Sequence, residues 1–386
     1  MPRPLRVAID LRPLALEHVT GVGQVILQIL EELGAEGVAF TGLAHRPVPE
    51  GRIPDGIPVL HESGSGGRIR WESAVLPRLL RAVEPAPDLH HATWNHGVPR
   101  NAPVPSVLTV HDVIPWVRPD LVPWPRPGWL HRSLYRGAVR VGVRRAARVT
   151  ADSAATLRDL VARVPGAAAK AEVVPVALPR WYRPHSSGGG AEAARARWNE
   201  GRPYWLYLGG FDPRKGVPDL LGAISVVGAE AETGPVPTLL LPGGLGPLAT
   251  EYEARARAEG VDARFPGYVE DRDLPSLFAG ASLFLYPSRY EGFGIPLLFA
   301  MASGVPVVAS DAGSIPEIVG DAGRLYPAGD VRALAGLLRE ASGTRDFGRD
   351  AAALGLERVR GFSLERFRER MLRVYEEAAS RRGGSA

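Results

Sequence analysis

The side chains best suited to chemistry lie around glycine turns that follow apolar runs. In residues 287–323, PSRYEGFGIPLLFAMASGVPVVASDAGSIPEIVGDAG, Gly292 and Gly294 carry no Cβ, so the backbone there can approach a ligand closely. A helix is expected to begin near Pro296, and the free N–H groups of its first turn suit an anion. Glu291 lies in the turn before this helix, where a carboxylate can accept hydroxyl groups. On spacing alone, an ordinary turn with a solvated glutamate fits equally well.

A pair of cations follows a second glycine turn. In YLGGFDPRKGVPDLLGAI, residues 207–224, Arg214 and Lys215 are adjacent, and Lys215 is one of only two lysines in the chain. A guanidinium can bind two oxygens of an anion at once, while an ammonium acts as a point charge. The alternative is a solvated loop, which the preceding Gly-Gly turn and the rarity of lysine disfavour.

A third polar group closes an apolar run in VLTVHDVIPWVRPD, residues 107–120. His111 and Asp112 follow this run, at the end of a strand where open α/β sheets bind their ligands. A capping aspartate beside a structural histidine is the alternative. The Gly21-x-Gly23 turn in TGVGQVILQIL is a weak signal, because it lacks the third glycine of a dinucleotide fingerprint and the Gly-Lys-Ser/Thr of a P-loop.

These groups need a scaffold, and the chain alternates apolar runs with amphipathic helical runs. The expected strands are β-branched or fully apolar, as in parallel strands covered on both faces: 5–9, 107–110, 148–151, 172–176, 205–208, 238–241, 283–286 and 305–309. Helices are expected over 23–33, from a Ser153 cap to 164, from an Asp330 cap to 340, and over 363–379. The alternation predicts an α/β fold built from βαβ units.

The alternation breaks once, in PHSSGGGAEAARARWNEG, residues 184–201. Its SSGGG run is typical of a flexible linker. We therefore expect an N-terminal domain over 1–185, a linker over 186–201 and a second domain over 202–362. The helical segment 363–386 would follow and could pack back on the first domain. Two similar open sheets facing each other across a cleft are the natural architecture.

Composition excludes several classes of site. The 386 residues suit two domains, and 45% apolar with 23% charged residues is the balance of a soluble globular protein. Without cysteine there are no disulfides, catalytic thiolates or Cys-ligated metals, and no histidines have metal-ligand spacing. The net charge of +4 agrees with an anionic ligand, but no nucleic-acid module is present. Without a leader-like start or a long apolar run, we expect a cytoplasmic protein.

The segments described above together resemble the family 4 glycosyltransferases of the GT-B fold. That family carries Glu, seven residues, then Glu, in a string much like EGFGLPPLEAMA. Here the string is EGFGIPLLFAMA, with Glu291 at the first position and Phe299 at the second. The resemblance covers most of the chain and is most specific from 203 to 330. It implies two Rossmann-like α/β/α domains and a retaining transfer from a nucleotide diphosphate sugar, without a metal cofactor.

The resemblance also assigns roles to single residues. Arg214 and Lys215 would hold the diphosphate, whose charge grows as the glycosidic bond breaks, and with Glu291 and His111 they are the expected catalytic residues. The acceptor side would include Asp112, Trp116 and His91, the last in DLHHATWN, residues 88–95. The expected donor-binding residues are Gly21, Gly23, Gly210, Val269, Leu274, Gly292, Phe293, Gly294, Ile295 and Phe299. The implied partners are a nucleotide sugar and a small-molecule, glycan or lipid-linked acceptor.

Phe299 departs from the family pattern and leads to a hypothesis about the donor. The family's second Glu accepts hydrogen bonds from the ribose hydroxyls, which a phenyl ring cannot do. An unpaired buried hydroxyl costs on the order of 1–3 kcal/mol. A 2′-deoxyribose has one hydroxyl fewer, so a dTDP-sugar would suit Phe299. Alternatively, Ser314 or Glu317 replaces the missing carboxylate, and the donor is a UDP- or GDP-sugar.

Other readings stay open. Phe299 also fits a non-catalytic sugar-nucleotide-binding subunit, whereas GT-B epimerases and phosphorylases lack the EGFGIP string. Trp116, Trp124 and Trp129 form either an acceptor platform or the packing of a long loop. The arginines at every fourth position line one helical face, which is either solvated or able to bind an anionic membrane or acceptor: Arg132, Arg136, Arg140 and Arg144. The solvated face is favoured, so membrane association is not indicated.

Overall fold

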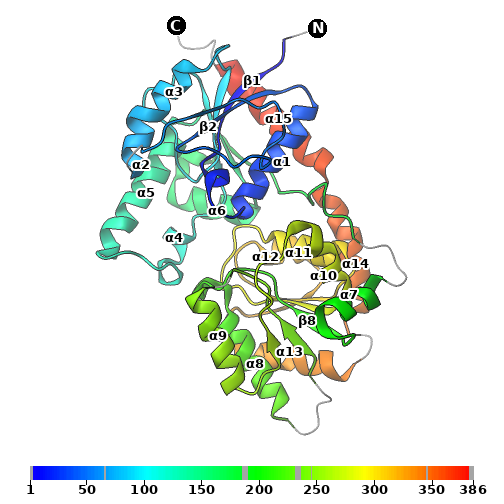
Figure 1. The fold of residues 1–386 in the computed structure, drawn as a ribbon. Helices are drawn as coiled ribbons and strands as arrows, with labels where there is room; N and C mark the ends of the chain where they lie inside the picture. Colours follow the sequence, from blue (N-terminus) through cyan, green and yellow to red (C-terminus); the bar gives the residue numbers. More distant parts are fainter. Residues whose placement is uncertain are drawn as a thin grey trace. The chain divides into compact units, whose positions relative to one another are not determined.

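The chain forms two compact units (Figure 1). The computed structural model describes residues 3–64, 67–184, 190–230, 236–244, 246–344 and 347–381. Unit 1 contains the described residues of 1–119, 123–177 and 364–386, and unit 2 those of 120–122 and 178–363. The chain therefore passes into unit 2 after Ala177, ahead of the segment expected to be the linker.

Most of the expected linker is a helix. The greater part of the SSGGG run lies outside the described residues, but α7 (Gly190–Asn199) is part of unit 2. Its Ala194 is buried beside Gly280, where an added Cβ would come within 3.0 Å of the Ala194 methyl group. The alanine-rich sequence after the glycines thus favours a helix that packs closely, and the expectation of a linker extending to residue 201 is wrong.

Within the described residues, unit 1 holds a seven-stranded parallel sheet of order β3-β2-β1-β4-β5-β6-β7. Its strands are β1 (Arg6–Asp10), β2 (Ala39–Ala44), β3 (Val59–His61), β4 (Leu89–Ala92), β5 (Ser106–Val110), β6 (Arg148–Ala151) and β7 (Ala171–Val173). Its helices are α1 (Gly21–Ala35), α2 (Gly67–Arg70), α3 (Leu76–Ala82), α4 (Ile114–Val117), α5 (Gly128–Arg145), α6 (Ala154–Arg163) and α15 (Leu364–Ser380), with a π-helical turn η2 (Trp71–Val75) between α2 and α3.

The strand register of unit 1 defines two covered faces. Ile9 pairs with His91, and His91 with Val107, so these residues share the face on which α1 and α15 pack together. Ala8, His90 and Ser106 lie on the opposite face. There, α3 packs on β1 and β2, and α5 and α6 pack on the strands from β4 to β6. The result is a three-layer α/β/α unit, to which the C-terminal helix α15 contributes.

Unit 2 repeats this architecture with a six-stranded parallel sheet, order β10-β9-β8-β11-β12-β13, in the described part of the chain. Helices α8, α9 and α13 cover one face, and α10 to α12 lie on the other (Figure 1). The strands are β8 (Tyr204–Leu206), β9 (Thr238–Leu240), β10 (Ala263–Arg264), β11 (Ala281–Tyr286), β12 (Val307–Ser310) and β13 (Arg324–Tyr326). The helices after α7 are α8 (Val217–Gly228), α9 (Pro247–Ala258), α10 (Leu274–Gly280), α11 (Ile295–Ala302), α12 (Ile315–Val319), α13 (Val331–Gly343) and α14 (Arg349–Val359).

The predicted pair of α/β/α domains with parallel sheets is confirmed, as are the two predicted helix caps. The Ser153 hydroxyl accepts the backbone N–H of Thr156 at 3.0 Å, and the Asp330 carboxylate accepts those of Arg332 and Ala333. Five strands with mixed or very short apolar runs are absent from those expected: β2, β3, β4, β10 and β13. Among the described helices, none combines the length and the apolar character needed to span a bilayer.

Candidate active site

The strands β8 and β11 are neighbours in the sheet of unit 2, and their carboxyl ends hold the predicted catalytic residues of this unit. The turn after β8 carries Arg214 and Lys215, and the loop after β11 carries Glu291. Because parallel strands end at the same edge, the two loops meet there. The backbone N–H of Arg289 donates to the Arg214 carbonyl at 2.7 Å, so the main chains of the loops are joined directly.

Two glycines allow this close approach. Gly216, with φ of +69°, follows the Arg-Lys turn, and a Cβ there would lie 2.1 Å from the carbonyl oxygen of Pro287. Gly313, with φ of +61°, lies in the loop after β12, and a Cβ there would lie 2.4 Å from the carbonyl oxygen of Glu291. Both the left-handed backbone and the contact distances require glycine. Three loops are thereby packed around Glu291.

Glu291 binds both predicted cations. Its Oε1 lies 2.7 Å from Lys215 Nζ and its Oε2 2.8 Å from Arg214 Nη1, which also donates to the Tyr290 carbonyl at 3.1 Å. The Glu291 side chain is 8% exposed, Lys215 14% and Arg214 21%. The carboxylate is therefore buried, while each cation keeps some access to solvent.

The two cations control the ionisation of Glu291. Burial alone would raise the pKa of Glu291, but the charges of Lys215 and Arg214 outweigh it and lower this pKa to about 2. Glu291 is therefore ionised at neutral pH. Asp212 Oδ1 also lies 3.5 Å from Arg214 Nε, but this second carboxylate is 40% exposed, so both cations remain available to a diphosphate. Such fixed cations stabilise a leaving group more as its negative charge grows.

The predicted donor residues Gly292, Phe293, Gly294 and Ile295 connect Glu291 to α11. Gly294 has φ of +104° and lies at the N-cap of α11, and Ile295 is its first residue. Ser314 is fully buried, and its hydroxyl donates to the carbonyls of Phe293 at 2.8 Å and Glu291 at 3.2 Å. Ser314 thus supports the loop from within and is not placed to replace the missing ribose-binding carboxylate.

Phe299 belongs to an aromatic cluster. Its ring is stacked on Tyr182, with centroids 4.3 Å apart and planes within 9°, and it lies 5.6 Å from Trp181 and 6.0 Å from Phe278. The Tyr182 hydroxyl donates to the Phe299 carbonyl and shares a hydrogen bond of 2.7 Å with Ser303. Phe299 is 4% exposed, so its ring holds the 181–182 segment on α11 and presents little surface to a ligand.

The other predicted donor residues are divided between unit 2 and unit 1. Val269 and Leu274 are buried, with Leu274 at the start of α10, and Gly210 is exposed after β8. In unit 1, Gly21 and Gly23 form the first turn of α1. A Cβ on Gly23 would lie 2.8 Å from Val19 Cγ1, so this glycine serves close packing.

His111 lies at the carboxyl end of β5 in unit 1 and is held on both sides. Its Nδ1 lies 2.8 Å from the Asp152 carboxylate, which follows the neighbouring strand β6, and its Nε2 lies 2.8 Å from the Thr93 carbonyl. Both partners are acceptors, so both bonds form only when both ring nitrogens carry protons. Burial lowers the pKa of His111, but Asp152 and the Thr93 carbonyl raise it above its usual value overall. Both ring nitrogens therefore face acceptors, and this arrangement favours the protonated ring over one that accepts a proton.

The predicted acceptor residues have three different environments. Asp112 accepts the Ile114 backbone N–H at 3.0 Å at the start of α4. Trp116 packs against the arginine stripe of α5, with the Arg140 guanidinium 4.7 Å and that of Arg136 6.0 Å from its ring centroid. The stripe therefore covers an indole on one side. Trp129, by contrast, is 65% exposed, and Trp124 meets the edge of Tyr135.

His91 has the environment of a structural residue, which differs from the predicted acceptor contact. It is fully buried on the sheet face beneath α15, where Nδ1 bonds to the Tyr375 hydroxyl at 2.8 Å and Nε2 to the Thr109 hydroxyl at 2.7 Å. Burial lowers its pKa to about 3. The sequence could not show this, because the covering helix lies 284 residues away.

Sequence reasoning missed several polar residues at the same edge of the unit 1 sheet. Asp10, the last residue of β1, forms a buried ion pair with Arg12, and His96 pairs with Glu72 after β4. The first pair could have been found from its place at a strand end. Glu72 lies on the π-helical turn η2, which no sequence pattern indicated.

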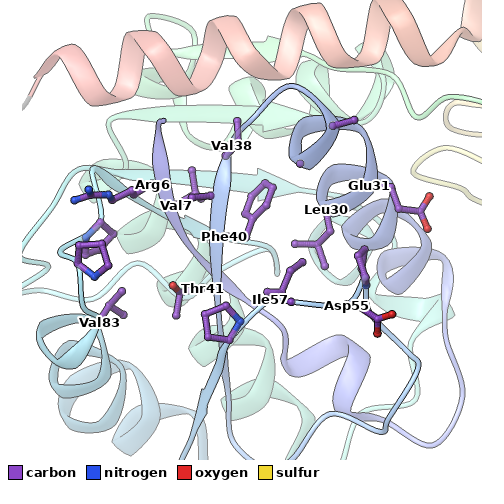
Figure 2. A pocket seen from close by; sticks show the side chains of 18 of the residues that line it. Arg6, Val7, Leu30, Glu31, Val38, Phe40, Thr41, Asp55, Ile57 and Val83 are labelled. Atoms are coloured by element: carbon purple, nitrogen blue, oxygen red, sulfur yellow. The ribbon is translucent and has the colours of Figure 1, made fainter. Parts of the chain in front are cut away.

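Unit 1 also contains a cavity of about 650 Å³ away from these residues. Figure 2 shows Phe40, Leu30 and Ile57 among its lining side chains, with Arg6 and Val7 at the start of β1. The cavity thus borders the amino-terminal ends of β1 and β2. Open α/β sheets bind ligands at the opposite, carboxyl ends, so this cavity is not the predicted site.

Comparisons with known proteins find sequence matches to both units. The model described as Glycosyltransferase Family 4 matches residues 19–178, and the one described as Glycosyl transferases group 1 matches residues 202–342. O-antigen chain mannosyltransferase B of Escherichia coli is 31% identical over 176 residues, 45% of each chain. Mannosylfructose-phosphate synthase of Agrobacterium fabrum is 41% identical over 59 residues, 15% of this chain and 13% of that one. Each of these matches spans less than half of the relative's length.

Solved structures share the fold over nearly the whole chain. A sucrose-phosphate synthase from Thermosynechococcus elongatus has a TM-score of 0.77 at 21% identity, covering 97% of this chain and 98% of that one. Anabaena HepE, in complex with UDP and glucose, has a TM-score of 0.72 at 18% identity, covering 96% and 99%. The two family models together span well over half of the chain. It therefore belongs to the group 1, family 4 glycosyltransferases of the GT-B fold.

Proposed function

We propose that this protein transfers a sugar, with retention of anomeric configuration, from a nucleotide diphosphate sugar to an acceptor hydroxyl. The observation that carries the proposal is the Arg214–Lys215–Glu291 group at the joined ends of β8 and β11. It combines a buried carboxylate, which can accept sugar hydroxyls, with two partly accessible cations, which can bind a diphosphate. The name of the Escherichia coli relative makes mannosyl transfer the first reaction to assay.

The proposed reaction balances without a protein base. The bond between the anomeric carbon and the departing diphosphate oxygen breaks, and the acceptor oxygen forms its new bond on the same face. The acceptor proton passes to the departing phosphate oxygen, while Arg214 and Lys215 stabilise the negative charge that develops there. The fixed hydrogen bonds of His111 support this route, since its ring has no nitrogen free to accept a proton. For His111 we keep the role that the family resemblance implies, contact with the transferred sugar.

The proposal also holds that protein cations replace a metal ion. In the family pattern, the Arg-Lys pair takes the place of a divalent cation at the diphosphate. Support for this comes from the hydrogen bonds by which Glu291 holds both cationic side chains. Each presents its charge from a short turn that is tied to the neighbouring loop by main-chain hydrogen bonding.

The experiment is a screen of UDP-, GDP-, ADP- and dTDP-sugars for thermal stabilisation and for turnover of the sugar nucleotide. A ligand at 100 times its dissociation constant adds about 2.7 kcal/mol to the free energy of unfolding. We expect at least one donor to stabilise the protein and to be consumed, and the variant with both Arg214→Ala and Lys215→Ala to lose both effects. Absence of stabilisation by every donor would overturn the proposal, and stabilisation without turnover would favour a non-catalytic binding subunit.

For the nucleotide we propose dTDP over UDP or GDP. No carboxylate stands at position 299, and the Ser314 hydroxyl already donates to two carbonyls. Glu317 is the competing candidate, because it lies half-buried in the first turn of α12. The wild-type affinities for dTDP and UDP decide between a dTDP donor and a ribonucleotide donor bound by Glu317. If UDP binds at least as tightly as dTDP, the dTDP proposal is refuted. The variant Phe299→Glu should shift preference toward UDP. Phe299→Leu is its control, because either substitution disturbs the stack on Tyr182.

A further inference from the structure

A cluster of aromatic and charged side chains occupies the carboxyl ends of β1, β2 and β4 in unit 1, and the proposed function leaves it unused. We call it the indole cluster: Arg12, His45, Trp71, Glu72, Trp94 and His96. Arg12 follows β1, His45 follows β2, and Trp94 and His96 follow β4. Trp71 and Glu72 open the turn η2. The cluster therefore lies at the sheet edge where ligands of such folds bind.

Arg12 is fixed at the centre of this cluster. Its Nη2 lies 2.6 Å and its Nε 2.9 Å from Asp10 Oδ2, and the pair is almost fully buried. The guanidinium lies 5.1 Å from the ring centroid of Trp71 and 5.9 Å from that of Trp94. Gly97 has φ of +115°, and a Cβ there would come within 3.2 Å of Arg12 Nη2. Asp10 thus neutralises the charge, while the two indoles hold the guanidinium plane.

A second polar pair forms the accessible part of the cluster. His96 Nδ1 lies 2.6 Å from Glu72 Oε1, and the imidazole is stacked on Trp94 with ring planes within 16°. The His96 side chain is 13% exposed and that of Glu72 22%. The pair offers a carboxylate, an imidazole and an adjoining indole to a ligand from solvent.

Three of the buried polar atoms without partners belong to this cluster or to its neighbour His90. Among the described residues, Trp71 Nε1, His45 Nδ1 and His90 Nε2 have no hydrogen-bond partner. Trp71 is 2% exposed and His90 fully buried, and the rings of Trp71 and His45 are nearly perpendicular, with centroids 6.5 Å apart. His90 lies on the same sheet face as Ala8, on which Trp71 packs. Such atoms are normally paired, and each unpaired one costs about 1–3 kcal/mol, so this site is built for hydroxyl groups or water.

The balance of charge indicates the class of ligand. The Asp10 carboxylate matches the charge of Arg12, the Glu72 carboxylate is hydrogen-bonded to His96, and the nearby Arg46 is exposed to solvent. An anionic ligand would therefore meet no uncompensated buried cation. Indole faces pack against the C–H faces of a sugar ring, while carboxylate, imidazole and indole N–H groups bind its hydroxyls. We propose that the indole cluster binds the acceptor as an uncharged sugar, either free or at the end of a glycan. That this sugar is the acceptor of the transfer rests on the proposed function.

The test uses the full chain labelled with 5-fluorotryptophan and followed by fluorine NMR. The titrated sugars are methyl α-mannoside, methyl α-glucoside, methyl α-galactoside and mannobiose. Each is compared with its 6-phosphate. Trp71→Phe and Trp94→Phe assign the two signals. Trp198→Phe assigns a control indole in unit 2, which also carries an arginine over its ring at 4.7 Å.

At least one neutral sugar should shift the Trp94 signal saturably without moving that of Trp198. Trp94→Ala and His96→Ala should each weaken that binding about tenfold while leaving stabilisation by the nucleotide sugar unchanged. Tighter binding of the phosphorylated sugar, absence of any shift across the panel, or wild-type affinity in both variants would each overturn the inference. Donor stabilisation is measured on the same samples. If no nucleotide sugar stabilises the wild-type protein, the proposed function fails while the sugar-binding inference stands, because sugar binding is measured separately by fluorine NMR.

Discussion

Replacing Lys215 by alanine tests the charge arrangement of the candidate site most directly. In the free protein, Lys215 Nζ lies 2.7 Å from Glu291, which keeps Arg214 as its second partner at 2.8 Å. Removing one of two partners leaves the buried carboxylate still paired. We therefore expect a loss of only about 1–3 kcal/mol in the free energy of unfolding, out of about 5–15 kcal/mol for a typical protein. The Lys215→Ala variant should stay folded.

The effect on transfer should be larger than the effect on stability. Removing one fixed donor from a developing negative charge typically costs about 3–4 kcal/mol, or roughly 10²–10³ in rate. Lys215 is 14% exposed, so its charge is only partly screened by solvent. The assay is turnover of the sugar nucleotide, with unfolding followed on the same sample. Arg214→Ala should act similarly, and the double variant should lose less than the sum, because the two cations share one ligand.

The chain provides a matched control in its other lysine. Lys170 Nζ bonds to the carbonyls of Arg144 and Ala146 in unit 1, at 3.0 and 2.7 Å, and takes no part in the candidate site. Lys170→Ala should therefore keep full turnover. Full turnover by a folded Lys215→Ala protein, or an equal loss in Lys170→Ala, would refute the assignment of the diphosphate to the Arg-Lys pair.

The remaining predictions concern pH, metal and stereochemistry. The pKa of Glu291 is lowered from 4.5 to about 2, so its ionisation adds about 3 kcal/mol of stability, fully present above pH 4.5 and lost as the pH falls toward 2. The stability difference between wild type and Glu291→Gln, measured by denaturant unfolding, should shrink over this window, and a constant difference contradicts the ion-pair account. Transfer should persist in excess chelator; its loss, with recovery on adding a divalent metal, rejects the metal-free mechanism. Proton NMR of the first product should show the donor's anomeric configuration, and an inverted product rules out retention.

The sequence by itself was informative where local chemistry decides the outcome. Apolar runs predicted β1, β5 to β9, β11 and β12, side-chain oxygens predicted the caps at Ser153 and Asp330, and the glycine turns marked both loops of the candidate site. Gly216 shows why such turns can be read locally. Its left-handed backbone and its contact with Pro287 tolerate no Cβ, so the constraint appears directly in the residue type.

Tertiary structure decided what depends on residues far apart in the chain. His91 is adjacent to polar neighbours in sequence, yet α15 covers it and makes it a core residue. Phe299 could be identified as a departure from a motif, but only packing showed that its ring stacks on Tyr182. The indole cluster likewise draws its members from four separate segments. A parallel sheet aligns the ends of strands that are distant in sequence, and this alignment follows from strand order, which no single segment encodes.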